Sequence, residues 1–350
     1  MGKIMVAQPT VSDIGEFGLI ARLQRFIPKF VPSGVITGIG DDAAVIRLDD
    51  QREILVTCDI QIEGQHFRSN HLSRYQLGRR AAAVNLSDIA AMGGKPLCAL
   101  TSLAFPQSLP LVDFDDLYRG ICDQLAEFSA AIIGGNLAQS DCGLIIDITL
   151  IGMVEFGQFL LRSGAKPNDR IFVTGPLGAS AAGFAILEHY GPAFPKQFDP
   201  LVQKHLQPIP RIAAGQMLAQ CGFATAMIDI SDGLAGDLQH ILAASQVGAE
   251  LYQYRIPLPD LLLQACELVN CSVWDIVLYG GEDYELLVTM KPETPDALLA
   301  TIAQQCNISL FEIGCVRAPE AGCFLIDSKG KKISIEAKAW DHFSHRSISS

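Results

Sequence analysis

Two acidic clusters, far apart in the chain, limit how this sequence can fold. Each cluster lies at the end of an apolar stretch, beside Gly or Ser rather than Lys or Arg. Carboxylates that are crowded without basic partners repel each other, by about 4 kcal/mol per pair at ~4 Å and an effective dielectric of ~20. A compact fold that brings the clusters together must therefore also hold a positive charge. The first cluster contains Asp41, Asp42, Asp59 and Asp88, and the second contains Asp229 and Asp232.

The chemistry of these clusters points to metal ions and phosphates. Hard oxygen ligands select hard cations, and Mg²⁺ usually completes its coordination shell with waters and substrate phosphates. The formal net charge of −12 leaves no basic face for a nucleic-acid backbone. We therefore expect no nucleic-acid partner, and we expect Mg²⁺ to mediate contacts between this acidic protein and phosphates.

Length and composition favour a two-domain enzyme of the cytoplasm. With 350 residues the chain can form two domains, and 49% hydrophobic against 18% charged residues is typical of a packed globular protein. The sequence shows neither a signal-peptide pattern nor an apolar run long enough to span a membrane, so we expect no membrane partner. Its ten cysteines include no C-x-x-C pair, so we expect reduced thiols.

Strand-like and helix-like segments alternate in both halves of the chain. This alternation predicts two α/β or α+β domains. The turn-rich segment 162–169 gives the expected boundary, with domains at 1–160 and 161–350. We expect strands at 54–60, 97–105, 131–133, 144–154, 170–174, 226–230, 285–290 and 310–316, helices at 77–92, 111–129, 234–244 and after residue 180, and a hairpin at 323–335.

Acids of the first half stand in unusual places. Asp59 ends an apolar strand, where Asp is disfavoured, although a solvated strand end is the alternative. Asp88 lies in the most apolar helical stretch of this half, and a buried carboxylate needs a cation or several donors. Asn85, three residues earlier, shares its helical face, so both could reach one ligand. Of the adjacent Asp41 and Asp42, at most one can enter a given pocket, because neighbouring strand residues face opposite sides.

The second half contains two acidic turns. Asp229 follows an apolar strand that passes directly into a helix, the usual position for ligand contacts in α/β sheets. Ser231 can cap that helix or bind a phosphate, so a plain capped helix is the alternative. The turn at 280–285 is rich in glycine and acid and suits either a site or a surface. The sequence has no P-loop, kinase-type glycine loop or dinucleotide fingerprint.

Taken in order, these motifs resemble the thiamine-monophosphate kinase family. The resemblance covers nearly the whole chain. No single segment is decisive, but together the segments occur in the same order as in the family. The matching segments are 15–17, 38–42, 59, 63–67, 83–93, 134–135, 162–167, 229–233, 280–285 and 341–343.

The resemblance implies a fold, a reaction and partners. The family belongs to the superfamily of aminoimidazole ribonucleotide synthetase. It implies an N-terminal α/β domain whose sheet pairs with its twin in a homodimer, and a C-terminal α+β domain. It also implies direct transfer of the γ-phosphoryl group of ATP to thiamine monophosphate, the final step of thiamine diphosphate biosynthesis. Several Mg²⁺ ions are expected, with K⁺ as a candidate monovalent ion.

The resemblance also assigns roles by position. Cys58 would contribute its backbone carbonyl, since a thiol is a poor Mg²⁺ ligand. We assign no catalytic base, because the acceptor is already an anionic phosphate. The metal positions are Asp42, Thr57, Cys58, Asp59, Asp88, Asn136, Asp229 and Asp232; the ATP positions are Gly135, Asn136, Arg162 and Ser231; the substrate positions are His66, Glu282 and Trp340.

Two positions depart from the family pattern. The usual Gly-Gly-Asp ends here in Asn136, which loses a charge, so one Mg²⁺ is expected to bind more weakly. An aromatic residue expected near the C-terminus is Ala337, and Trp340 is the candidate to stack on the substrate ring instead. Two other functions stay open. The first is another enzyme of the superfamily, acting on a ribonucleotide or selenide, and the second is a paralogue that binds nucleotide without transferring phosphate.

Overall fold

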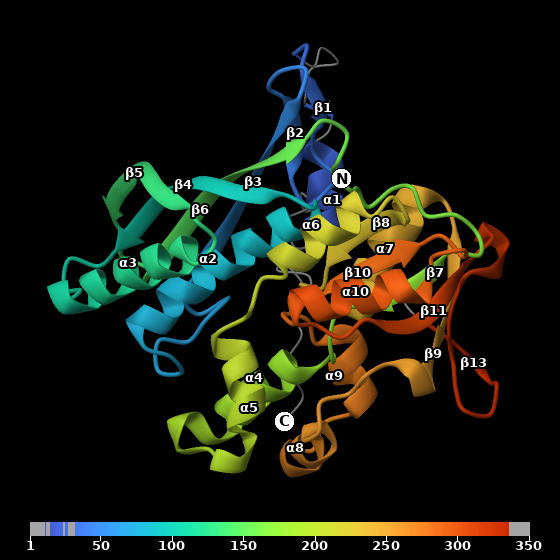
Figure 1. Ribbon diagram of the computed structural model, residues 1–350. Coiled ribbons are helices and arrows are strands. Elements are labelled where there is room, and N and C mark those ends of the chain that lie inside the picture. Colours follow the sequence, from blue (N-terminus) through green and yellow to red (C-terminus); the bar gives the residue numbers. More distant parts are fainter. Residues whose placement is uncertain (1–10, 12–14, 24, 27–31, 336–350) are drawn as a thin grey trace, which may run out of the picture.

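The computed structural model describes residues 11, 15–23, 25, 26 and 32–335. Two mixed sheets, one in each half of the chain, pack against helices (Figure 1). The helices are α1 (Gly15–Leu23), α2 (Arg74–Ala91), α3 (Leu111–Ala126), α4 (Ala179–Tyr190), α5 (Asp199–Leu206), α6 (Ile212–Gln220), α7 (Leu234–Ser245), α8 (Leu262–Val269), α9 (Val273–Tyr279) and α10 (Asp296–Cys306). The strands are β1 (Val35–Thr37), β2 (Ala44–Arg47), β3 (Arg52–Ile62), β4 (Lys95–Phe105), β5 (Ala131–Gln139), β6 (Ile145–Glu155), β7 (Arg170–Val173), β8 (Ala224–Asp229), β9 (Gly248–Tyr252), β10 (Leu286–Met290), β11 (Phe311–Arg317), β12 (Cys323–Ile326) and β13 (Lys332–Ser334).

The first sheet has the strand order β1-β2-β3-β6-β4-β5, and β4 and β5 form its parallel pair. The helices α2 and α3 cover one face (Figure 1). Side chains of β3 alternate between the two faces: Leu55 and Thr57 are buried, whereas Cys58 and Ile60 are exposed. The sheet therefore has a packed face and an open face, and the strands expected at 54–60, 97–105 and 144–154 are confirmed.

The helix α2 lies between the two halves. It begins with a capping box, in which the Ser73 hydroxyl accepts from the Gln76 N–H and the Gln76 side chain accepts from the Ser73 N–H. It ends before Gly93, whose φ of +74° favours glycine. Ala82 and Ala90 are fully buried, because small side chains let neighbouring elements pack closely on several sides. The predicted helix and its glycine stop are confirmed. The helix begins at Arg74 rather than at residue 77, because the capping box fixes its first turn there.

The second sheet has the strand order β13-β12-β9-β11-β7-β10-β8. Strand β8 forms one edge, pairs with β10 and ends at Asp229. The four strands expected in this half and the C-terminal hairpin are confirmed. Strand β9 was not predicted, because Gly248, Ala249 and Glu250 have low strand propensity and only the tertiary pairing with β11 and β12 overrides it.

The two halves share a hydrophobic core. Leu86 and Ile89 of α2 belong to the same buried cluster as Met227 of β8. A Cβ at Gly215 in α6 would lie 2.0 Å from the carbonyl oxygen of Ala90, so glycine allows α6 to approach the end of α2. This shared burial fixes α2 relative to β8, and with them the acids that each element carries.

Strand β5 differs from the prediction. The strand expected at 131–133 continues through two glycines, because a register shift between Ala99 and Leu100 keeps them paired with β4. A Cβ at Gly135 would lie 2.0 Å from the carbonyl oxygen of Thr101, so close backbone approach explains this glycine.

Among the described residues, no single helix has the length and apolarity to cross a membrane. The adjacent helices α8 and α9 reach that length and apolarity only when taken together, and the chain bends by 110° between them.

Candidate active site

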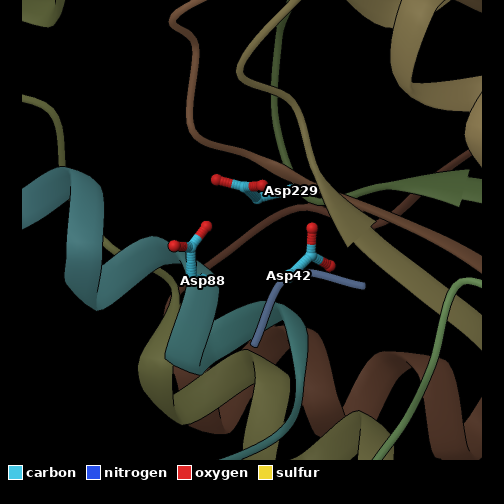
Figure 2. A group of neighbouring side chains, drawn as sticks. All are labelled: Asp42, Asp88 and Asp229. Atoms are coloured by element: carbon cyan, nitrogen blue, oxygen red, sulfur yellow. The ribbon is translucent and has the colours of Figure 1, made fainter. Parts of the chain in front are cut away.

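Three carboxylates from distant parts of the sequence meet at the seam between the two halves. Asp42 comes from the turn before β2, Asp88 from the last turn of α2 and Asp229 from the end of β8. One oxygen of each lies within 4.8 Å of the others (Figure 2). We call these three residues the carboxylate trio. The trio joins one acidic cluster of the sequence to the other.

Neighbouring hydroxyl groups hold the trio in place. The Thr57 hydroxyl of β3 donates to Asp88. The Ser87 hydroxyl of α2 donates to Asp229, and this bond crosses the seam. Because β3 and α2 pack in one half and β8 lies in the other, these bonds fix the carboxylates relative to the backbone of both halves.

Burial and mutual repulsion oppose ionisation of the trio. Burial raises the pKa of Asp229 to about 8, and the carboxylate of Asp42 adds to the shift. Burial also raises the pKa of Asp88 well above its ordinary value, and the charges of Asp59, Asp229 and Asp42 raise it further. Burial raises the pKa of Asp42 as well, against the attraction of Arg162. Without a cation, this group therefore retains protons near neutral pH.

Arg162 is the cation that the fold places beside Asp42. Its Nε and Nη2 lie 3.1 and 2.5 Å from Oδ1 of Asp42. Its backbone N–H donates to Oδ2 of Asp41 at 3.2 Å. The adjacent acids therefore have different surroundings: Asp42 joins the trio, and Asp41 faces the backbone of the segment between the halves.

The donor set fits a hard divalent cation. Among the described residues, Oδ2 of Asp42 is buried and has no hydrogen-bond partner. Leaving a buried carboxylate oxygen unpaired is costly. A cation between the carboxylates would satisfy this oxygen and remove their repulsion, and oxygen donors of this kind select Mg²⁺ over softer ions. The residues present therefore suit a Mg²⁺ site.

The turn after β8 is held by backbone contacts rather than by a serine cap. Gly233 is the N-cap of α7, and no described side chain caps this helix, so of the two roles that the sequence left open for Ser231 the capping role is wrong. The Asp232 N–H instead donates to Oδ2 of Asp237 at 3.1 Å. The Ser231 carbonyl accepts from the Glu282 N–H at 2.8 Å. This turn therefore docks against the turn at the end of α9.

Glu282 and His66, which the resemblance assigns to substrate binding, lie close enough for the charge of His66 to influence Glu282. Glu282 pairs with Arg80, and its Oε2 lies 3.3 Å from Nδ1 of His205. Although burial opposes ionisation, the Arg80 guanidinium and the His205 hydrogen bond lower the pKa of Glu282 to about 2, with a smaller contribution from His66. Nδ1 of His66 accepts from the Ile62 N–H at 3.0 Å. The carboxylate of Glu282 is therefore ionised and firmly held.

Other predicted positions lie apart from the trio within one chain. Gly135 and Asn136 are on β5, at the far edge of the first sheet (Figure 1). Strands β4 and β6 separate β5 from β3, which corresponds to about 14 Å at the usual strand spacing. The thiol of Cys58 is on the open face, with its Sγ 3.5 Å from Oδ2 of Asp147. Trp340 lies outside the described residues.

Polar groups within α2 complete the site in ways that the sequence alone did not reveal. The side-chain oxygen of Asn85, which the sequence placed on the same helical face as Asp88, accepts from the Asp59 N–H at 3.1 Å. That Asn85 and Asp88 reach one ligand stays a prediction. Ser87 and Arg80 received no role from the sequence. The sequence signal that could have identified these two residues is the presence of polar and charged side chains in a helix with no clearly solvated face.

The raised pKa of Asp229 predicts how the stability of the metal-free protein depends on pH. The folded state holds a proton on Asp229 up to about pH 8, whereas its ordinary pKa is 3.8, so the folded state binds more protons between these values. The free energy of unfolding should therefore fall as pH rises through this window. Asp229→Asn keeps an oxygen for Ser87 and removes the charge, so it should raise stability at pH 8 by about 1 kcal/mol or more and flatten the decline.

Urea unfolding in the presence of a chelator measures this effect. Asp260→Asn, which alters an exposed carboxylate before α8, is the matched control for the substitution. A full wild-type decline in the Asp229→Asn variant would show that Asp229 titrates normally.

Comparison with known proteins is consistent with this geometry. The family model of the AIR synthase related protein N-terminal domain matches residues 40–154, and that of the AIR synthase related protein C-terminal domain matches residues 166–322. The thiamine-monophosphate kinase of Bacillus subtilis is 35% identical over 334 residues, covering 94% of this chain and 99% of its own length. That of Escherichia coli is 37% identical over 333 residues, covering 94% and 98%.

Solved structures give the same result. The structure of AaThiL complexed with AMPPCP and TMP matches with a TM-score of 0.82 and 32% identity, covering 96% of this chain and all of that chain. Thiamine monophosphate kinase from Aquifex aeolicus matches with a TM-score of 0.76 and 31% identity, covering 91% and 98%. Escherichia coli HypE, at 16% identity and a TM-score of 0.68, shares the fold. This chain therefore belongs to the thiamine-monophosphate kinase family and has the two-domain AIR synthase-related fold.

Proposed function

We propose that this chain transfers the γ-phosphoryl group of ATP to thiamine monophosphate, giving thiamine diphosphate and ADP, as the final step of thiamine diphosphate biosynthesis. Support comes from the name shared by its full-length relatives and from the AaThiL complex with AMPPCP and TMP. The observation that carries the proposal is the carboxylate trio at the seam. Phosphoryl transfer depends mainly on positioning and charge neutralisation, which such a site supports.

Within this proposal, the trio binds Mg²⁺. The unpaired Oδ2 of Asp42 and the raised pKa values of Asp88 and Asp229 support this assignment. When bound, Mg²⁺ supplies the positive charge that neutralises nucleotide and acceptor phosphates. The proposal that K⁺ also binds is supported by the family resemblance alone. Further proposed Mg²⁺ ligands, at positions that the resemblance assigns, are Thr57, the Cys58 carbonyl, Asp59 and Asp232. Asn136, which lies apart from the trio in the same chain, would bind another of the several expected ions.

Groups of the chain itself would orient the reactants for in-line transfer. The Thr57 and Ser87 hydroxyls restrain two carboxylates of the trio. The side chain of Arg162 is 22% exposed, so its guanidinium can face a phosphate while it neutralises Asp42. The acceptor is already an anion, so the reaction needs no general base. Gly135, Asn136, Arg162 and Ser231 are the proposed ATP contacts, and His66, Glu282 and Trp340 are the proposed substrate contacts.

The proposal includes a homodimer that forms through the open face of the first sheet. Ile60 and Leu100 are 45% and 40% exposed on this face, and exposed apolar side chains gathered on one surface favour association. Residues 1–160 would then form the ATP-binding, metal-binding and dimerisation domain, and residues 161–350 the second domain. Sedimentation should give a dimer mass, and Leu100→Glu should give the monomer mass; a monomeric wild-type protein would contradict the proposal.

We also propose a cytoplasmic location. All ten cysteines are free in the structure, as is typical of proteins in reducing compartments. Cell fractionation tests this, and recovery of the protein in a secreted fraction would contradict it.

The first kinetic prediction concerns the acceptor. Thiamine monophosphate should be phosphorylated by ATP, whereas free thiamine should not, because the site is built to hold two phosphate groups close together. Measuring ADP formation with thiamine, thiamine monophosphate and an aminoimidazole ribonucleotide precursor separates the alternatives. Turnover of the ribonucleotide alone would assign the chain to another superfamily activity, and nucleotide binding without turnover would indicate a paralogue that has lost transfer.

The second kinetic prediction concerns Asp88. Asp88→Asn preserves the size of the side chain and an acceptor for the Thr57 hydroxyl but removes the charge that Mg²⁺ would bind. The rate should fall at least ~100-fold at saturating substrates, about 2.7 kcal/mol in the barrier. Asp115→Asn, an exposed residue of α3, should retain the wild-type rate. A near-normal rate for Asp88→Asn at high Mg²⁺ would show that Asp88 has a purely structural role.

A further inference from the structure

The acidic turn, residues 280–285, is bound to three different parts of the molecule by its three acids. Asp283 accepts from backbone N–H groups at the start of α4, at 2.6 and 3.1 Å. Glu285 pairs with an arginine that precedes α6. Glu282 pairs with Arg80 in the middle of α2. The first two contacts lie within the second half of the chain, and only the contact of Glu282 reaches the helix that carries Asp88.

The backbone of the acidic turn is unusual as well. Glu282 and Tyr284 have φ values of +60° and +51°, a region that side chains other than glycine rarely adopt. Their N–H groups donate to the carbonyls of Ser231 and Ile230, at 2.8 and 2.9 Å. The acidic turn is therefore held in a strained conformation against the turn that follows Asp229.

Arg80 makes the contact by which the acidic turn crosses the seam. Its side chain is 1% exposed, and it donates both to Glu282 and to the backbone carbonyl of His205. The other oxygen of Glu282 faces the His205 imidazole at 3.3 Å. One third of the Glu282 side chain remains exposed. Arg80 and His205 therefore hold the carboxylate from the buried side, while the exposed part of the side chain stays accessible to a ligand.

Arg80 and Asp88 are carried by the same helix. They are eight residues apart, which places them about 12 Å apart along its axis. A rigid helix thus links the proposed metal side of the site to the proposed substrate side. Moving the Glu282 carboxylate relative to Asp88 would require breaking the pair with Arg80.

We propose that Arg80 is a positioning residue for the acceptor: it sets the place of the Glu282 carboxylate relative to the carboxylate trio and acts on thiamine monophosphate through Glu282. The inference rests on the proposed function, in which Glu282 contacts the acceptor. Loss of Arg80 leaves Glu282 without its ion pair and frees the acidic turn to relax. Acceptor binding then weakens more than ATP binding, because Glu282 contacts the acceptor with its side chain, whereas the proposed ATP contact that touches the acidic turn, Ser231, does so through its backbone carbonyl.

A double-mutant cycle tests this inference. Arg80→Met should raise the KM for thiamine monophosphate about tenfold or more and leave the KM for ATP within about twofold. In a Glu282→Gln background, Arg80→Met should change the acceptor KM by less than about twofold, because the residue acts through Glu282. Arg80→Lys keeps the charge but not the two-pronged contact and should give an intermediate KM; it replaces the methionine variant in the cycle if that variant does not fold.

Arg211→Met is the matched control, because it breaks the buried pair with Glu285 in the same turn without touching Glu282. Both single variants should lower the melting temperature, but only Arg80→Met should raise the acceptor KM selectively. Equal acceptor KM values in the two variants, or additive effects in the cycle, would overturn the positioning role of Arg80 but leave the proposed function intact. A wild-type protein that turns over no thiamine monophosphate would overturn the proposed function, and this inference with it.

Discussion

Three carboxylates are buried together at the seam, and the structure around them has to offset the cost of that burial. Asp42, Asp88 and Asp229 each lose hydration on folding, and each raises the cost of ionising the others. Their proximity is therefore unfavourable in itself and must be offset elsewhere in the molecule. The offset comes from the apolar core shared by both halves, where side chains of α2 pack with those of β8 and β10. Stability supplied by this packing keeps three carboxyl groups close together, where a cation could bind them.

The same seam explains why the site needs both halves of the chain. Neither half contains the trio, because Asp229 ends a strand of the second sheet and the other two members belong to the first half. Polar contacts that cross the seam, Ser87 with Asp229 and Arg80 with Glu282, act together with the core. A change in the docking of the halves would therefore alter metal-side and substrate-side groups at once.

Sequence reasoning could predict the features that are local. Apolar periodicity and a glycine stop were enough for α2, and β-branched runs were enough for β3 and β6. Asp88 was singled out because a charge in an apolar helix conflicts with burial, and the structure places it in the trio. Features that depend on tertiary pairing were missed. Strand β9 has weak propensity, and the side chain of Asn85 supports the backbone of β3. Capping of α7 by Ser231, which the sequence left open, does not occur.

We propose that the carboxylate trio is a divalent cation site whose carboxyl groups hold protons when no cation is bound. Calorimetric titration of Mg²⁺ at pH 7, in two buffers with different enthalpies of ionisation, tests it most directly. Because the pKa of Asp229 is about 8 and that of Asp88 is raised, Mg²⁺ binding should release protons, and Asp88→Asn should weaken both the binding and the release. Mg²⁺ binding that releases no protons and is unchanged in Asp88→Asn would show that the trio is not the cation site.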